Sequence, residues 1–398
     1  MSEVSSALYW SLPGPLGFKE RVTDAARNWR SLVLSFTQEM PVDPERAVQS
    51  ALADANIAEP VVLRVTDGMN ISAAVGIHFG AINMPAETLA HHAHGAAHAV
   101  VLFAKGMRAQ AQCEKYAREF MEAASRECTG DVRLVVAIYS GDCQHDQQDA
   151  DVRVIAFDGG LTASEMQAYV SQRMVSYEGP GSTSLYRHLV TEFAAFDAGM
   201  AERLADMDTG QLMALPQSLM PLVDENLLRW ARRDWVYGTR SNVSKEDHPL
   251  HECYLSRHAG PEMEANVRKA RRRYWRACVK ALTPWLEMRR EFVLEALREP
   301  LTQLAHSDGT ITKRVGSSDR SVPIDEIEYN DIVYLSYQSL QSLDSRTLTR
   351  RQSDAVEVCH LAKKVRDALA HSRPPLANEI TNLISAMDTF CEASGSHL

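Results

Sequence analysis

The sequence lacks several features that would place a protein in a broad class at once. It has no run of about 18 apolar residues, so we expect no membrane span. Its N-terminus has no basic segment followed by an apolar one, which argues against a secretion signal. The seven cysteines form no Cys-x-x-Cys pair, as is typical of reduced thiols in a cytosol. We therefore expect a cytoplasmic protein without membrane contact.

A phosphate-binding loop and an excess of positive charge are also missing. No GxxxxGK[ST] pattern occurs, and the segment 38–44, which follows the first expected strand, has neither glycine nor lysine. The formal net charge is −10, so any contact with nucleic acid would have to use a local patch. These absences predict no bound cofactor.

What the N-terminal half does contain is an alternation of short apolar runs with helical patterns. Runs rich in Val, Ile, Leu or Phe occupy 31–37, 61–65, 99–104, 133–139 and 152–157. Expected helices occupy 44–55, 85–97, 109–127 and 162–174. Such alternation predicts an α/β domain with a largely parallel sheet. The order of elements resembles a P-loop NTPase core that has lost its phosphate loop, which implies a degenerate platform without nucleotide hydrolysis.

The strand pattern ends near residue 180, and helical patterns follow. The segment 177–184 is expected to be a loop, and 185–204 and 262–304 to be helices. Pro284 should kink or break the second helix, because proline lacks a donor and clashes with the preceding turn. The polar, Gly/Ser-rich stretch 306–323 is typical of a linker. Expected helices at 324–343, 349–370 and 377–391 complete the chain.

The fold class expected is thus α/β followed by all-α. The domain organisation that we predict is an α/β domain at 1–180, a helical domain at 181–305, a linker at 306–323 and a helical domain at 324–398. No internal repeat and no coiled-coil heptad pattern was found.

Two groups of histidines raise the question of a metal site. The first would share one helix face at i, i+3 and i+7, and comprises His91, His94 and His98. The second lies in a loop-like stretch and comprises His248, His251, Cys253 and His258. Neither spacing matches a zinc pattern, and the first has no adjacent acid or thiol. Solvated or capping histidines are the better interpretation, so we expect no metal.

The strongest basic segment lies in the long helix at 262–304. Its candidate nucleic-acid-binding residues are Lys269, Arg271, Arg272, Arg273 and Arg276. Arginine beside aromatic side chains suits phosphate contact and base stacking. However, these charges spread around the helix, and the alternative is a solvated helix that pairs with acids such as Glu262, Glu264 and Glu287. RNA contact therefore remains one of two interpretations.

The most specific motif lies at 364–375, which reads KVRDALAHSRPP. Arg366 and His371 are separated by four residues, a polar residue (Asp367) follows the arginine, and two prolines follow the histidine. This pattern resembles the Arg-x4–6-His signature of the HEPN superfamily, in which Asp367 would replace a commoner asparagine. HEPN domains are helical and occur in prokaryotic RNases, toxins and anti-phage defence proteins. The resemblance covers about 324–391.

The resemblance implies a metal-independent RNase site, in which a 2′-hydroxyl attacks the adjacent phosphate. His371 would act as the acid/base and Arg366 would bind the phosphate. Residues five apart on a regular helix diverge by about 140°, so the two side chains converge only if the helix ends near Ala370. The family also implies that a second copy completes the site across a two-fold axis. A histidine in a last turn can equally just cap the helix.

Our leading hypothesis is a prokaryotic, anti-phage defence-type adaptor or effector that binds a partner protein or RNA without catalysis, as a complex with that partner or as a homodimer. The first alternative is a metal-independent endoribonuclease that uses Arg366, Asp367 and His371. The second alternative is a degenerate nucleotide-sensing module that acts through the N-terminal sheet.

Overall fold

The computed structural model describes most of the chain, and its helices and strands fall into two compact units. The described residues are 3–37, 41–57, 60–93, 98–126, 130–139, 147–148, 153–157, 160–175, 180–235, 237–258, 261–315, 318–338 and 348–393. The first unit combines Met1–Arg173, Phe193–Asp206 and Leu219–Met263. The second unit combines Met174–Glu192, Met207–Ser218 and Glu264–Leu398. Each unit is described by itself below.

A largely parallel sheet is the centre of the first unit. Five strands are parallel: β1 (Ser31–Ser35), β2 (Val61–Thr66), β3 (Ala99–Lys105), β4 (Arg133–Ile138) and β6 (Arg153–Ala156). The short β5 (Gln147–Gln148) pairs antiparallel with β6, and the strand order is β2-β3-β4-β1-β6-β5. The central strands are almost fully buried, which explains their unbroken apolar sequences. The predicted α/β fold with a parallel sheet is confirmed.

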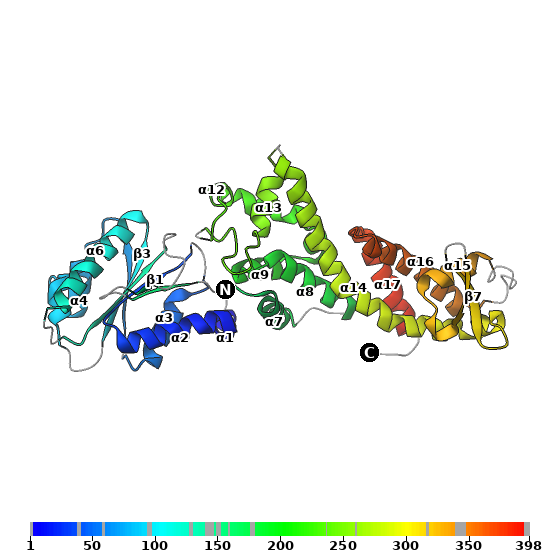
Figure 1. Ribbon diagram of the computed structural model, residues 1–398, viewed down its shortest axis with the longest axis horizontal. Helices are drawn as coiled ribbons and strands as arrows, with labels where there is room; N and C mark the ends of the chain where they lie inside the picture. The colour runs from blue at the N-terminus through cyan, green and yellow to red at the C-terminus, as the bar shows by residue number, and fades with distance from the viewer. Residues whose placement is uncertain are drawn as a thin grey trace. The chain divides into compact units, whose positions relative to one another are not determined.

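Helices cover both faces of this sheet (Figure 1). On one face, α2 (Pro13–Asn28) packs on β1 and β6, and α3 (Pro44–Asp54) packs on α2. On the other, α4 (Ile71–His78), α5 (Ala86–His91) and α6 (Met107–Ala124) form a core with β2, β3 and β4. The helix expected at 85–97 corresponds to α5, which ends earlier, at His91. Residues 94–97 lie outside the described residues.

An aromatic cluster attaches the N-terminal helices to the sheet. The Phe18 ring of α2 lies 5.3 Å from Phe157 and 5.5 Å from Phe36, and Trp10 of α1 (Glu3–Ser11) lies 6.3 Å from Phe18. Trp235 donates a hydrogen bond from its indole to the carbonyl of Phe157 at 3.2 Å. This contact ties the later helices of the first unit to the sheet.

Those later helices are short and alternate with irregular segments. They are α7 (Ala163–Arg173), α9 (Ala198–Ala205), α11 (Met220–Asp224), α12 (Leu227–Trp230) and α13 (Pro249–Ser256). The helix expected at 185–204 is interrupted, because α8 (Pro180–Ala194) ends before Ala195, whose φ is +55°. Asp197 then starts α9 by accepting a hydrogen bond from the Met200 N–H at 3.1 Å.

The second unit is almost entirely helical, as predicted for the C-terminal region. Its elements are α8, α10 (Thr209–Met213), η1 (Gln217–Leu219), α14 (Pro261–Leu304), β7 (Thr310–Val315), β8 (Ser318–Pro323), η2 (Ile324–Glu326), α15 (Tyr329–Gln338), α16 (Arg350–Ala370) and α17 (Ala377–Glu392), with α8 and α14 extending a few residues into the first unit. The helix α14 continues through Pro284 and Pro300 as one helix, so Pro284 does not break it. Of the described helices, none is long and apolar enough to span a membrane.

Two expectations about connecting segments were wrong. The expected linker 306–323 contains an antiparallel hairpin of β7 and β8, in which Ile311 pairs with Val322 and both side chains are buried. The expected loop 177–184 is helical from Pro180 onward, while 176–179 lie outside the described residues. The stretch 181–305 also contributes to both compact units rather than forming one of its own.

Candidate functional site

The helix α16 presents the Arg366–His371 motif and ends where the sequence predicts. It starts with a capping box, in which Thr349 and Gln352 exchange hydrogen bonds. It ends at Ala370, followed by His371 as the C-cap and by Ser372 with a φ of +54°. The Arg373 N–H then donates to the Ala368 carbonyl at 2.9 Å, which is the closing bond of a Schellman motif.

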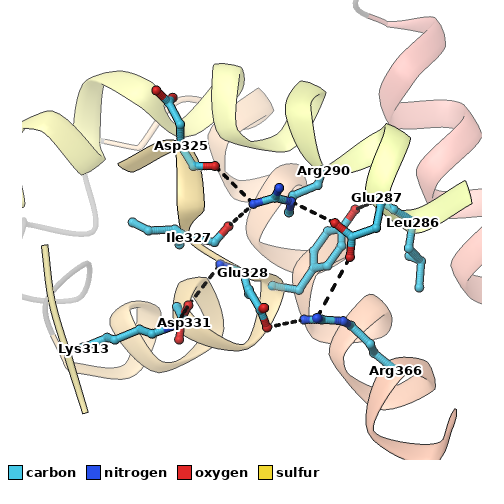
Figure 2. A network of polar contacts seen from close by, with 10 residues as sticks. Leu286, Glu287, Arg290, Lys313, Asp325, Ile327, Glu328, Asp331 and Arg366 are labelled. Carbon is cyan, nitrogen blue, oxygen red and sulfur yellow. Dashed lines mark hydrogen bonds and ion pairs between the residues drawn. The ribbon is translucent and has the colours of Figure 1, made fainter. Parts of the chain in front are cut away.

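Arg366 is held by two glutamates from other elements (Figure 2). Its Nη1 donates to Glu328 Oε2 at 2.6 Å, and its Nη2 lies 4.0 Å from Glu287 Oε1. The hydrogen bond and the charge of Arg366 lower the pKa of Glu328 and keep it ionised, although burial opposes this. The guanidinium is therefore already neutralised by acids of its own chain.

The same contacts connect α14, α15 and α16. Arg290 of α14 lies 3.3 Å from the Glu287 carboxylate and donates to the carbonyls of Asp325 and Ile327 at 3.2 and 3.1 Å. Tyr329, which is fully buried, donates its hydroxyl to the Leu286 carbonyl at 2.7 Å. Figure 2 shows that Arg366 points into this network of α14 and α15. The arrangement has the character of a structural clamp.

The other two motif residues lie apart from that clamp. Asp367 pairs with Lys363, one turn earlier on α16, at 2.5 Å. His371 is exposed, and no described hydrogen bond or ion pair involves its ring. No contact among the described residues joins His371 to Arg366. Within one chain, the structure does not bring together the acid/base and the phosphate-binding cation that an RNase site requires.

The basic segment of α14 divides into an inner and an outer set. Arg273 is buried and donates to the Glu192 carbonyl at 3.1 Å. Arg276 and Lys280 both contact the Glu192 carboxylate, each at 2.7 Å. Burial opposes ionisation of Glu192, but hydrogen bonds from the two cations lower its pKa. Two of the predicted nucleic-acid-binding residues, Arg273 and Arg276, thus join α14 to α8.

The outer set remains on the surface of α14. Lys269, Arg271 and Arg272 are exposed, and the neighbouring Arg268 lies 3.5 Å from Glu264. Beside them, Trp275 donates its indole N–H to the carbonyl of Leu369, near the end of α16, at 2.9 Å. The indole of Trp275 is therefore engaged within the chain.

The histidine groups do not form a metal site in the described part of the chain. His91 is in the last turn of α5, and His94 lies outside the described residues. His248 is buried, with its ring stacked on Trp230 at 5.0 Å, and His251 Nδ1 lies 2.7 Å from the Trp230 carbonyl. No described group of three or more His, Cys, Asp or Glu residues is arranged to hold a metal ion.

Sequence reasoning missed two of the acids that surround the arginines. Glu328 and Glu192 carry no local motif, and they lie 38 and 84 positions from Arg366 and Arg276, with which they pair. Glu287 was expected to pair with the basic segment, and it contacts Arg290 and Arg366 instead. Comparison with protein-family models and with curated proteins finds no match to this chain.

Proposed function

We propose that the chain is a non-catalytic, HEPN-like adaptor or effector of a prokaryotic, anti-phage defence type, which binds a partner protein or RNA. In this proposal the N-terminal sheet is the degenerate P-loop-like platform that the order of its elements resembles. The C-terminal elements from η2 to α17, within 324–398, form the HEPN-like domain, and this domain works as a docking module.

One observation carries the non-catalytic part of the proposal: the ion pair between Arg366 and Glu328. A cation that stabilises a phosphorane must be free to face the substrate. Glu328 and Glu287 would repel a phosphate from Arg366, and displacing Glu328 would break the short hydrogen bond between its carboxylate and Arg366. The exposed, isolated His371 fits a helix C-cap that stabilises the helix dipole.

The exposed cations of α14 support RNA as one partner. Lys269, Arg271 and Arg272 present three positive charges on neighbouring positions of an otherwise acidic chain. Three phosphate contacts would give a salt dependence with a slope of about −2 for single-stranded RNA. This is the weak, non-specific binding expected of an adaptor.

RNA cleavage in the presence of EDTA tests the proposal against the endoribonuclease alternative. We expect the same background rate for the wild type, His371→Ala and Arg366→Ala. Cleavage by the wild type that both substitutions abolish would establish the nuclease and refute the adaptor. Glu328→Gln sharpens the comparison, because it frees Arg366 from its nearest acid; if a latent nuclease exists, this variant should cleave faster than the wild type.

Fluorescence anisotropy with a labelled single-stranded RNA tests the choice of partner. The charge reversals Lys269→Glu, Arg271→Glu and Arg272→Glu together should abolish binding, whereas Arg350→Glu, at the start of α16, should not. If the triple variant and the wild type bound the RNA with equal affinity, RNA would be excluded as the partner of this surface, and a protein partner would remain. The nucleotide-sensing alternative predicts heat on titration with ATP or GTP, and we expect none.

A further inference from the structure

A cavity of about 810 Å³ opens at the carboxyl edge of the parallel sheet, within the first unit. Its lining comes from the ends of neighbouring strands and from the first turn of α6, which begins after Gly106 at the end of β3. Crevices at this edge are where open α/β sheets bind ligands, and pockets for small molecules measure about 300–1,000 Å³. Place and size therefore both suit a small molecule.

Most of the lining is apolar and partly aromatic. Phe103 and Tyr139 contribute rings from β3 and from the residue after β4, and Met107 contributes a thioether at the start of α6. Met107 is 87% exposed, which is unusual for a large apolar side chain at a helix start. Aromatic rings and methionine favour flat, apolar groups, because they stack and adapt their shape at little cost.

The charges of the lining leave one cation without an acid. Arg64 donates to both carboxylate oxygens of Glu45, at 2.7 and 2.8 Å, so this pair is neutral. Lys105 is exposed at the end of β3, and its side chain has no hydrogen-bond or ion-pair partner in the described part of the chain. The charged lining residues, Glu45, Arg64 and Lys105, sum to +1.

We propose that this cavity binds a planar aromatic molecule with a single negative charge, with its rings against Phe103, Met107 and Tyr139 and its anionic group facing Lys105. A nucleoside triphosphate does not fit this assignment, because its charges would meet one free lysine and the carboxylate of Glu45. The proposal is independent of the C-terminal docking function, and it would stand if that function failed.

Titration of the full chain with 8-anilinonaphthalene-1-sulfonate tests the site, because this fluorescent probe is an aromatic monoanion with a flat naphthalene ring. We expect saturable binding at one site. Lys105→Met should weaken it by about fivefold, the effect of one ion pair at a partly exposed position. Lys115→Met is the matched control, since Lys115 is an exposed lysine of α6 (side chain 75% exposed) outside the lining of the cavity, and its change should leave the affinity unaltered.

A further variant and an uncharged probe separate the apolar contribution to binding from the ionic one. Met107→Asp places an acid in the first turn of α6, where it favours the helix, and should weaken the probe more than tenfold. The uncharged analogue N-phenyl-1-naphthylamine should bind the wild type and Lys105→Met equally. Probe affinity that is the same in all three variants and the wild type would overturn the proposal, and so would displacement of the probe by ATP at lower concentration than by benzoate.

Discussion

Replacing Arg366 with methionine should loosen the contact between α15 and α16, because the guanidinium that contacts Glu328 and Glu287 is lost. The side chains of Arg366 and Glu328 are 33% and 46% exposed, so water screens part of their attraction. Their hydrogen bond is short and joins two charged groups. Its contribution to stability should therefore exceed that of an exposed ion pair and fall below that of a buried one. We expect a coupling free energy of about 1 kcal/mol.

This coupling should disappear in acid. The pKa of Glu328 lies below the ordinary value of 4.5, and the largest cause is the hydrogen bond from Arg366. A carboxyl group whose pKa is lower in the folded chain than in the unfolded chain stabilises the folded chain. This stabilisation is complete at pH values above the pKa of the unfolded chain. Stability is then lost as the pH falls below 4.5 and through the lower, folded-state pKa of Glu328.

A double-mutant cycle of Arg366→Met, Glu328→Gln and the double variant measures this coupling. Native-state hydrogen exchange of the α15 and α16 amides gives the local free energy of opening in the full chain. Arg350→Met, which removes an exposed arginine at the start of α16, is the control and should change it by less than about 0.5 kcal/mol. A coupling near zero at neutral pH, or one that persists below the folded-state pKa of Glu328, would refute the clamp.

Two other features give predictions of their own. Glu192→Gln should lower the free energy of unfolding in urea by about 2 kcal/mol, because Arg276 and Lys280 lose the nearly buried carboxylate that joins α8 to α14. An unchanged free energy of unfolding would show that the two ion pairs contribute nothing to stability. Burial raises the pKa of Cys113 and Cys278 to about 12, so at neutral pH iodoacetamide should label both slowly in the folded chain and rapidly in urea, as read by peptide mass. Fast labelling of the folded chain would contradict their burial.

The sheet was predictable because its strands are buried on both faces and carry continuous apolar runs, as β3 does from Ala99 to Ala104. The helices α1, α2 and α4 were missed. In α2 a buried stripe of Phe18, Val22, Ala25 and Ala26 was present, but prolines and glycines at the start of the helix obscured it. The hairpin β7–β8 was missed because Ile311, Val315 and Val322 are the only aliphatic residues in an otherwise polar, loop-like sequence.

At the candidate site, the local part of the prediction succeeded. The two prolines at 374–375 indicated that the helix ends near Ala370, and it does. The environment of Arg366 could not be predicted, because Glu328 and Glu287 lie 38 and 79 positions earlier, on elements whose packing only the fold determines. The same holds for Glu192, which is 84 positions from Arg276.

The hydrogen bond from the Trp275 indole to the Leu369 carbonyl has a consequence for how this chain can vary. It joins the basic stretch of α14 to the last turn before His371, two segments that are 94 positions apart. Only tryptophan offers this donor at that reach, so even a phenylalanine at 275 would leave the carbonyl without it. Because the acceptor is a backbone carbonyl, which every residue at 369 supplies, this contact restricts the choice of residue at 275 and not at 369.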